Sequence, residues 1–267
     1  MIPKPPAEIE SKELAMACRR RNMNSMKALL GSAALGAGLA VFTCAIQAPA
    51  FAADPWAEAP TAQRPAPGTP DLNGGWIMSR PPHALKTTAG KDPPLLPAAR
   101  GEYQKRQAAL KADPATDPIA GCLMHGVPRI LYAPYPVLIA QEKDRVNFVH
   151  EVNHTFRVVS LTRKPADPNA EDPAWMGYST GRWSGKTLVI DTVGFNDKTW
   201  LDYSGLPHGP KLKVEERYTL ANANTIIGEI KITDPDFYSN SWSTPFTLKR
   251  IPNYQPKEMV CVHDHKM

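Results

Sequence analysis

The chain has 267 residues, of which 42% are hydrophobic and 21% are charged, and its formal net charge at pH 7 is +5. This length is enough for one domain with its own core. The basic residues form no stripe interleaved with aromatic residues, so the sequence argues against a nucleic-acid partner.

Residues 1–52 have the pattern of a secretory signal peptide. A basic segment ending at Lys27 precedes an uncharged, apolar run over residues 28–42, and Ala50-Phe51-Ala52 provides a small-residue cleavage site. We predict cleavage after Ala52 and a mature protein that is periplasmic or secreted and not attached to a membrane. The alternative is a membrane anchor, because the run approaches the ~20 residues that a span requires.

The signal segment also accounts for much of the positive charge. It holds six basic and three acidic residues, so the mature chain has a formal net charge of +2. The sequence leaves the start of translation open among three methionines: Met1, Met23 and Met26.

Residues 53–70 are rich in Pro and Ala and are predicted to form a disordered lead-in. Residues 71–267 are predicted to form a single β-rich domain. A short strand around Trp76 comes first, and residues 98–111 then combine strong helix formers, with no glycine after Gly101. This segment is the one N-terminal helix that we expect in the domain.

From Pro134 onward the hydrophobic pattern alternates with a period of two, which indicates β-strands. Tight turns are predicted at 142–144, 184–185 and 221–224, and they divide the strands into hairpins. The predicted strands are 137–141, 145–150, 156–161, 176–183, 186–193, 212–220, 225–233, 244–251 and 259–262.

An antiparallel meander of this size must close or stack to protect its edges. We therefore predict a mainly β fold, an up-and-down barrel of the lipocalin or calycin kind, with a β-sandwich as the alternative. Such a barrel has an interior that can hold one small ligand.

Cys122 and Cys261 are the two cysteines that follow the signal segment. In an oxidising compartment we expect them to form a disulfide, which would close a loop of about 140 residues and contribute about 4 kcal/mol. The alternative is a metal site in which these thiolates join the imidazoles of His125, His263 and His265. We favour the disulfide and expect neither a metal nor a cofactor.

Several blocks of the chain resemble a known group of proteins. The blocks are GWIMSRPP, DPIAGCLMHGVPRILYAPYP, MGYSTGRWSGKTLVIDTVGFNDKTWLDYSGLPHG, LKVEERYTL and MVCVHDH. They resemble an uncharacterised family of secreted proteins from proteobacteria and acidobacteria, and the GRWxGxTLVxDTxGFNDxTWLD block is the most specific part. The resemblance spans about Asp71 to Cys261. It implies export, the cysteine pair and a β-rich fold, and it implies no particular activity.

The first candidate site is the polar loop that follows the strand at 186–193. Its side chains with functional potential are Asn196, Asp197, Trp200, Asp202, Tyr203 and His208. If the strand ends at a barrel mouth, this loop lies over the cavity, where Asp202 and His208 would form a carboxylate–imidazole pair for acid–base chemistry. The structural alternative is that the polar side chains bond the backbone of turns while Trp200 caps the core.

The second candidate site consists of polar residues within strands. His150 and Glu216 fall on apolar strand faces, Arg157 points away from its apolar neighbours, and His154 lies at the start of a strand. A carboxylate on an apolar face is costly unless it is paired. The possible partners of Glu216 are Arg157, Arg182, Arg217 and Arg250. The pair would belong either to the barrel wall or to the polar floor of a ligand cavity.

Two functions are left open by these residues. The sequence lacks G-x-S-x-G, Walker, G-x-G-x-x-G and H-E-x-x-H motifs, which argues against covalent hydrolase and nucleotide chemistry. The first function is binding of a small apolar or aromatic molecule by Asn196, Asp197, Trp200, Tyr203, Arg157 and His150. The second is a cofactor-independent lyase, hydratase or isomerase that uses His208, Asp202, His154 and Glu216. An enzyme requires at least two of these last four to meet in one pocket. The oligomeric state is open.

Overall fold

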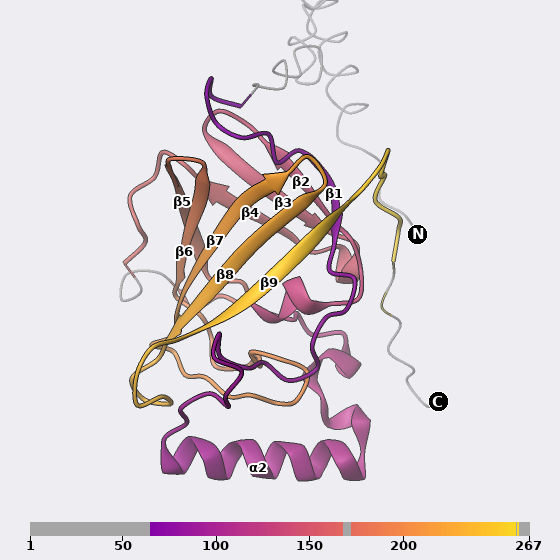
Figure 1. The fold of residues 1–267 in the computed structure, drawn as a ribbon. Helices are drawn as coiled ribbons and strands as arrows, with labels where there is room; N and C mark the ends of the chain where they lie inside the picture. The colour runs from indigo at the N-terminus through magenta and orange to yellow at the C-terminus, as the bar shows by residue number, and fades with distance from the viewer. Residues whose placement is uncertain (1–64, 168–171, 260, 262–267) are drawn as a thin grey trace, which may run out of the picture. The chain divides into compact units, whose positions relative to one another are not determined.

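The computed structural model describes residues 65–167, 172–259 and 261. Nine strands close into a barrel in chain order (Figure 1). They are β1 (Gly74–Ile77), β2 (Val137–Gln141), β3 (Arg145–His150), β4 (Phe156–Ser160), β5 (Tyr178–Ser184), β6 (Thr187–Val193), β7 (Lys213–Asn222), β8 (Thr225–Thr233) and β9 (Trp242–Ile251). The predicted barrel is confirmed. The predicted signal peptide and most of the lead-in lie outside the described residues.

The three predicted turns join β2 to β3, β5 to β6 and β7 to β8. At the second turn Ser184 pairs with Thr187, and Gly185 has a φ of 58°. Glycine takes this left-handed conformation without a steric cost, which suits a two-residue hairpin loop.

The barrel is not antiparallel throughout, and this corrects the predicted meander. β4 and β5 run parallel and pair only through Val159–Ser179 and Ser160–Thr180. All other neighbouring strands are antiparallel. The long connection from Ser160 to Tyr178 explains the difference, because it carries the chain back to the end of the barrel where β4 began.

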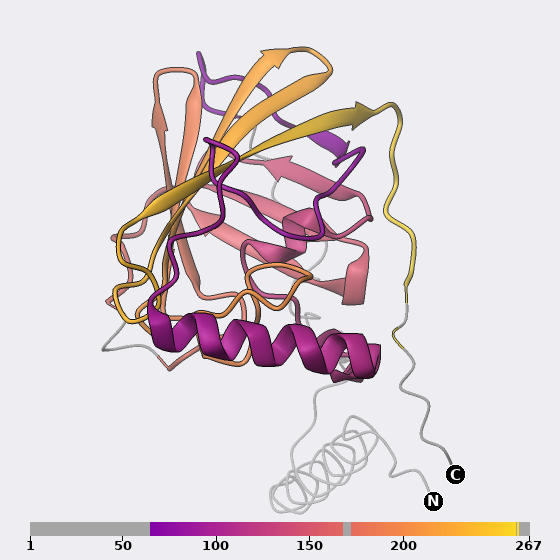
Figure 2. The same ribbon diagram turned by 60° about the horizontal axis from the view of Figure 1, so that its bottom comes forward.

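Helix α2 (Pro97–Ala112) matches the predicted helix to within a residue at each end. The prediction that this helix is N-terminal is wrong, because β1 precedes it in the domain. The helix lies across one end of the barrel, next to the loop that follows β6 (Figure 2). The Tyr103 hydroxyl joins it to that loop through a hydrogen bond with Ser204 Oγ of 2.6 Å.

The interior of the barrel is filled by side chains from alternate positions of the strands. Fully buried apolar residues come from most strands and include Trp76, Ile139, Val146, Val159, Leu188, Ile190, Ile226 and Ile230. Gly228 also faces the interior, and a Cβ there would stand 2.1 Å from the ring of Phe246. Only glycine therefore fits between β8 and β9 at this point.

The segment after β9 runs back along the outside of the barrel. The Tyr254 hydroxyl donates to Glu151 Oε1 at 2.7 Å, and the Met259 N–H donates to His154 Nε2 at 3.1 Å. Met259 and Cys261 lie outside any strand, so the strand predicted over 259–262 is wrong where it is described; Val260 and Val262 lie outside the described residues. Side-chain contacts of this segment take the place of strand pairing.

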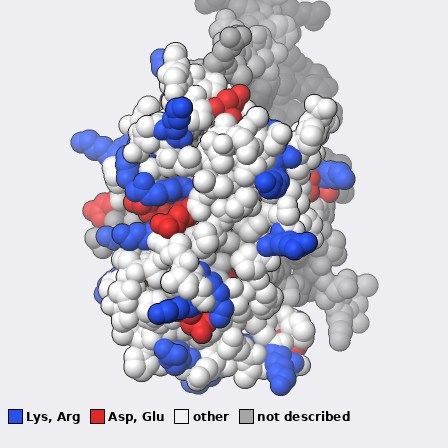
Figure 3. Space-filling model, in the orientation of Figure 1, with Lys and Arg blue, Asp and Glu red and all other residues white. Residues whose placement is uncertain are grey.

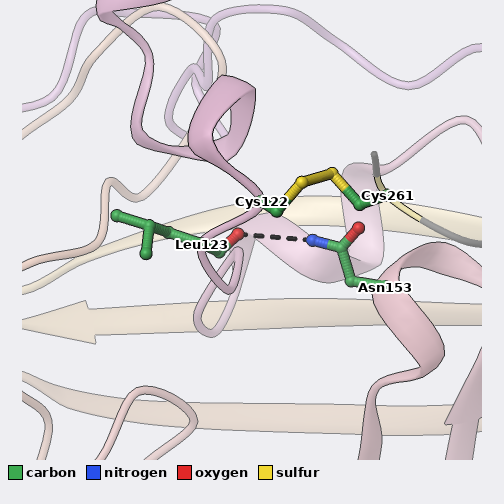
Figure 4. The surroundings of a disulfide bond; sticks show 4 residues. All are labelled: Cys122, Leu123, Asn153 and Cys261. Carbon is green, nitrogen blue, oxygen red and sulfur yellow. Dashed lines mark hydrogen bonds between the residues drawn. A yellow bond between two sulfur atoms is a disulfide. The ribbon is translucent and has the colours of Figure 1, made fainter. Parts of the chain in front are cut away.

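The predicted disulfide is confirmed. Cys122 is bonded to Cys261, with a Cα–Cα distance of 5.7 Å (Figure 4). Beside it, Asn153 Nδ2 donates to the Leu123 carbonyl at 3.3 Å. The bridge fastens the segment after β9 to the region that follows α2.

Charged residues of both signs are interspersed on the face drawn in Figure 3. Exposed ion pairs include Arg217 with Glu215 at 2.9 Å and Lys211 with Asp236 at 3.1 Å. Pairs of this kind contribute little to stability because water screens them. Within the part of the chain that the structure describes, no helix has the length and apolarity needed to cross a membrane.

Candidate functional site

A buried ion pair lies inside the barrel between β4 and β7. Arg157 Nη2 contacts Glu216 Oε2, and the two side chains are 5% and 1% exposed. Arg157 also donates to Thr192 Oγ1 at 2.7 Å and to Ser179 Oγ at 2.9 Å, while the Tyr218 hydroxyl donates to Glu216 Oε1 at 2.9 Å. The predicted arginine partner of Glu216 is therefore Arg157, and this network provides hydrogen bonds to both charges.

Strand alternation places this arginine inside. Phe156 and Val158 are 71% and 47% exposed, whereas Arg157 between them is buried. Successive side chains of a strand point to opposite faces, so the inward position falls on the charged residue. Its guanidinium lies 5.8 Å from the ring centre of Phe148. The apolar neighbours of Arg157 are left on the outer surface.

Two buried histidines lie in this part of the molecule. His150 of β3 stacks against Phe148, with 6.5 Å between ring centres, and burial followed by the charge of Arg157 lowers its pKa to about 3. His125 is buried with no hydrogen bond to Nδ1 among the described residues, and burial followed by the charge of Arg129 lowers its pKa to about 4. Both imidazoles are neutral at physiological pH.

These neutral imidazoles predict a stability that falls with acidification. The unfolded chain binds protons near pH 6.5, whereas folded His150 and His125 bind them only near pH 3 and 4. Stability is therefore full above pH 6.5 and decreases as the pH falls. At pH 5 each histidine should cost about 2 kcal/mol, at 1.36 kcal/mol per unit of pKa difference.

Urea unfolding at pH 7 and pH 5 measures this loss. His150→Asn should reduce the difference between the two pH values by about 2 kcal/mol. His83→Asn is the matched control, because His83 is exposed. The same pH dependence in all three proteins would contradict the assignment.

Asp202 organises the loop that follows β6. Its Oδ1 accepts from the N–H groups of Ser204 at 2.9 Å and Leu206 at 3.0 Å and from the Ser204 hydroxyl at 2.8 Å. Its Oδ2 accepts from the Leu85 N–H at 2.9 Å. The buried carboxylate thus satisfies backbone donors of two segments, which is the structural role that the sequence analysis left open.

His208 lies elsewhere in the same loop. Its Nε2 is 2.7 Å from Thr199 Oγ1 and its Nδ1 is 3.1 Å from the Gly209 carbonyl, and burial lowers its pKa. No hydrogen bond joins it to Asp202. The structure does not bring the two together as a carboxylate–imidazole pair.

The other catalytic candidates are also apart. His154 is exposed and accepts from the Met259 N–H, and Glu216 is bound within the barrel. No hydrogen bond or ion pair links any two of His154, Asp202, His208 and Glu216, all of which lie in the described part of the chain.

The aromatic residues of the loop pack against arginines. Trp200 is buried and lies 5.4 Å from the guanidinium carbons of both Arg106 and Arg129. Tyr203 lies 4.3 Å from the guanidinium carbon of Arg129, whose Nη1 donates to Asp117 at 2.9 Å. Both rings are packed at the end of the barrel covered by α2.

Asn196 and Asp197, in contrast, line an open hollow of about 450 Å³. A second hollow of about 580 Å³ adjoins it at Pro210. We call the two together the loop groove. Its lining residues are Pro173, Trp175, Val193, Phe195, Asn196, Asp197, Lys198, Pro210, Lys211, Leu212, Lys213, Thr233 and Pro235.

Backbone pairing builds one wall of the loop groove. Ala174 forms a parallel bridge with Phe195, and the Asn196 N–H donates to the Ala174 carbonyl at 2.9 Å. This places Trp175 beside the loop, where Lys198 Nζ lies 6.0 Å from its ring centre. Trp175 and Lys198 were not among the residues predicted for a site. In the sequence, Trp175 precedes one predicted strand and Lys198 follows the next. The bridge between Ala174 and Phe195 makes the two residues neighbours.

The structure offers no support for a metal site in the described residues. Both cysteine sulfurs are used in the disulfide, and no group of three or more His, Cys, Asp and Glu side chains within the described ranges could hold an ion. His263 and His265 lie outside the described residues.

A comparison with known protein families and with curated protein sequences finds no match for this chain.

Proposed function

We propose that this protein is an exported binding protein that takes up a small apolar or aromatic molecule with an anionic group in the loop groove. The observation that carries the proposal is the open groove itself, which has apolar walls and basic side chains beside the same loop. Small-molecule sites commonly combine a mostly apolar lining with a few polar groups that fix the orientation.

The apolar walls favour an aromatic or aliphatic ligand. Trp175 and Phe195 line one hollow, and Val193 and Leu212 line the other. A planar ligand that stacks on Trp175 would gain about 0.5–1.5 kcal/mol beyond the area that it buries.

The basic side chains favour an anionic group on the ligand. Lys198, Lys211 and Lys213 line the groove against one acid, Asp197. Lys211 already contacts Asp236 at 3.1 Å. Lys198, which lies over Trp175, is therefore placed to contact a carboxylate on a ligand stacked against that ring.

Binding is better supported than catalysis. Asp202 and His208 are engaged by backbone and threonine partners, and neither lines the groove. A general acid or base must come within hydrogen-bond reach of its substrate. The groove offers Asp197 alone as a carboxylate, with no imidazole among its lining residues.

Fluorescence titration with anilinonaphthalene sulfonate, an aromatic anion, tests the proposal. Trp175→Ala and Lys198→Glu should each weaken binding about tenfold, which corresponds to about 1.4 kcal/mol. Phe156→Ala is the control for dye adsorbed on an exposed apolar residue, and Lys186→Glu is the control for the change in charge.

Both control proteins should bind the dye as the unmodified protein does. If Trp175→Ala left the affinity unchanged, the groove would not be the binding site. As a separate test, mass spectrometry of the protein isolated from its natural host should identify the bound molecule as an apolar or aromatic acid. N-terminal sequencing of the same sample should give a start at Ala53.

A further inference from the structure

A third hollow lies where the barrel is least regular, at the parallel β4–β5 contact. The two strands pair through only two residue pairs, and a hollow of about 670 Å³ opens beside them. We call it the seam pocket. Its lining residues are Asp144, Arg145, Val158, Ser160, Thr162, Arg163, Lys164, Pro165, Ala166, Asp167, Gly177, Tyr178, Ser179 and Thr180.

The Ser160 hydroxyl of the seam pocket has a proton to donate. Ser160 Oγ accepts from the Arg163 N–H at 3.0 Å and from the Thr162 N–H at 3.4 Å. Because a serine hydroxyl has one proton in addition to its two lone pairs, that proton is left for an acceptor supplied from outside.

The charged groups of the pocket also favour an acceptor. Arg163 and Lys164 supply positive charge, whereas Arg145 is already paired with Asp144 and Glu142. Asp144 is held by Arg145 through two contacts of 3.1 Å, and Asp167 is not free either. Donors in the pocket therefore outnumber the acceptors that are open to a ligand.

Ser179 connects the seam pocket to the buried ion pair. Ser179 is one of the lining residues, and its Oγ faces the barrel interior, where it accepts from Arg157 Nε at 2.9 Å and lies 3.1 Å from Thr192 Oγ1. The seam pocket therefore lies on the outer side of strands whose inner side holds the buried ion pair.

We propose that the seam pocket binds a small hydroxylated molecule with an oxyanion group, of the sugar-acid or sugar-phosphate class. Ser160 donates to a ligand oxygen, and Arg163 and Lys164 neutralise the charge. Tyr178 offers the flat face of its ring, because its hydroxyl is already engaged with the Asp172 carbonyl at 2.8 Å. This site shares no lining residue with the loop groove, so it stands independently of the function proposed there.

Isothermal titration at low ionic strength with glucuronate, inorganic phosphate and glucose tests this proposal. Glucuronate should bind saturably, and neutral glucose should bind at least about tenfold more weakly. Phosphate that binds as well as glucuronate would show that the oxyanion alone is recognised. Weaker phosphate would show that the hydroxyl groups of the ligand contribute.

Two variants place the binding in the seam pocket. The double variant Arg163→Glu/Lys164→Glu should lose about tenfold or more in glucuronate affinity, and Ser160→Ala should lose affinity without any change in charge. The matched control is Lys105→Glu/Lys111→Glu, which makes the same change in net charge at exposed positions of α2.

Two results would overturn the proposal. One is the absence of saturable binding of both glucuronate and phosphate. The other is an equal loss of affinity in the control variant, because it would show attraction by net charge rather than a site.

Discussion

Arg157→Met is expected to lower the free energy of unfolding by about 3–5 kcal/mol, because it leaves the carboxylate of Glu216 buried without its cation. The structure holds that carboxylate at 1% exposure, with Arg157 and the Tyr218 hydroxyl as its partners. The change also removes the donors to Ser179 and Thr192. Methionine fills much of the same volume as arginine. The loss in free energy of unfolding therefore comes more from the missing charge than from a change in packing.

Removing both charges should cost less than removing one. The double variant Arg157→Met/Glu216→Leu replaces a buried pair with apolar side chains, which is often close to neutral. We expect it to recover at least about 2 kcal/mol of the loss, with the remainder due to the Tyr218, Ser179 and Thr192 hydroxyls that lose partners.

Urea unfolding at pH 7 provides these free energies. Arg182→Met is the matched control, because Arg182 pairs with Asp191 on the surface, where the side chains are 55% and 38% exposed. That pair should contribute less than about 1 kcal/mol. Measuring Glu216→Leu alone completes the cycle: a double variant whose loss equals the sum of the Arg157→Met and Glu216→Leu losses would show that the charges do not stabilise each other.

The strands could be predicted from the sequence where their pairing is local. The turn at Gly185 and the alternation on either side of it fix the β5–β6 hairpin, because neighbouring residues determine both. The parallel pairing of β4 with β5 depends on where a long connection returns, and alternation carries no information about that path. The same limit hid the seam pocket, which exists because those two strands meet so briefly.

The pairing of the buried charges could likewise be predicted from the sequence only in part. Alternation puts Glu216 on the apolar face of its strand, but it puts Arg157 opposite Phe156 and Val158, so the pattern did not predict that Arg157 is buried. Four arginines were possible partners, and closure of the barrel brings Arg157 rather than another to Glu216. The identity of the pair is therefore a property of the three-dimensional arrangement.

The polar loop after β6 explains why its functional residues were hard to identify. Asp202 and Asp197 are the same residue type, five positions apart in one loop. Asp202 turns inward to the N–H groups of Leu85, Ser204 and Leu206, whereas Asp197 lines an open groove. Composition does not distinguish these two orientations, because each depends on which backbone donors the fold places nearby.

Replacing both cysteines is expected to cost about as much stability as removing the buried cation. Cys122 and Cys261 are 139 residues apart in sequence. Cross-linking so long a loop restricts the unfolded chain, which contributes about 4–5 kcal/mol in the chain-entropy model. Cys122→Ser/Cys261→Ser should therefore unfold at a lower urea concentration, and a reductant should lower the stability of the unmodified protein by a similar amount.

The reductant supplies an internal control, because it should not affect the double serine variant. For a chain that begins at Ala53, intact mass after alkylation should show two labelled thiols in the reduced, unmodified protein and none without reduction. The contacts of Tyr254 with Glu151 and of Met259 with His154 would still hold the segment after β9 when the bridge is absent. If the double serine variant unfolded at the same urea concentration as the unmodified protein, those contacts would suffice, and the disulfide would fasten only that segment rather than stabilise the barrel.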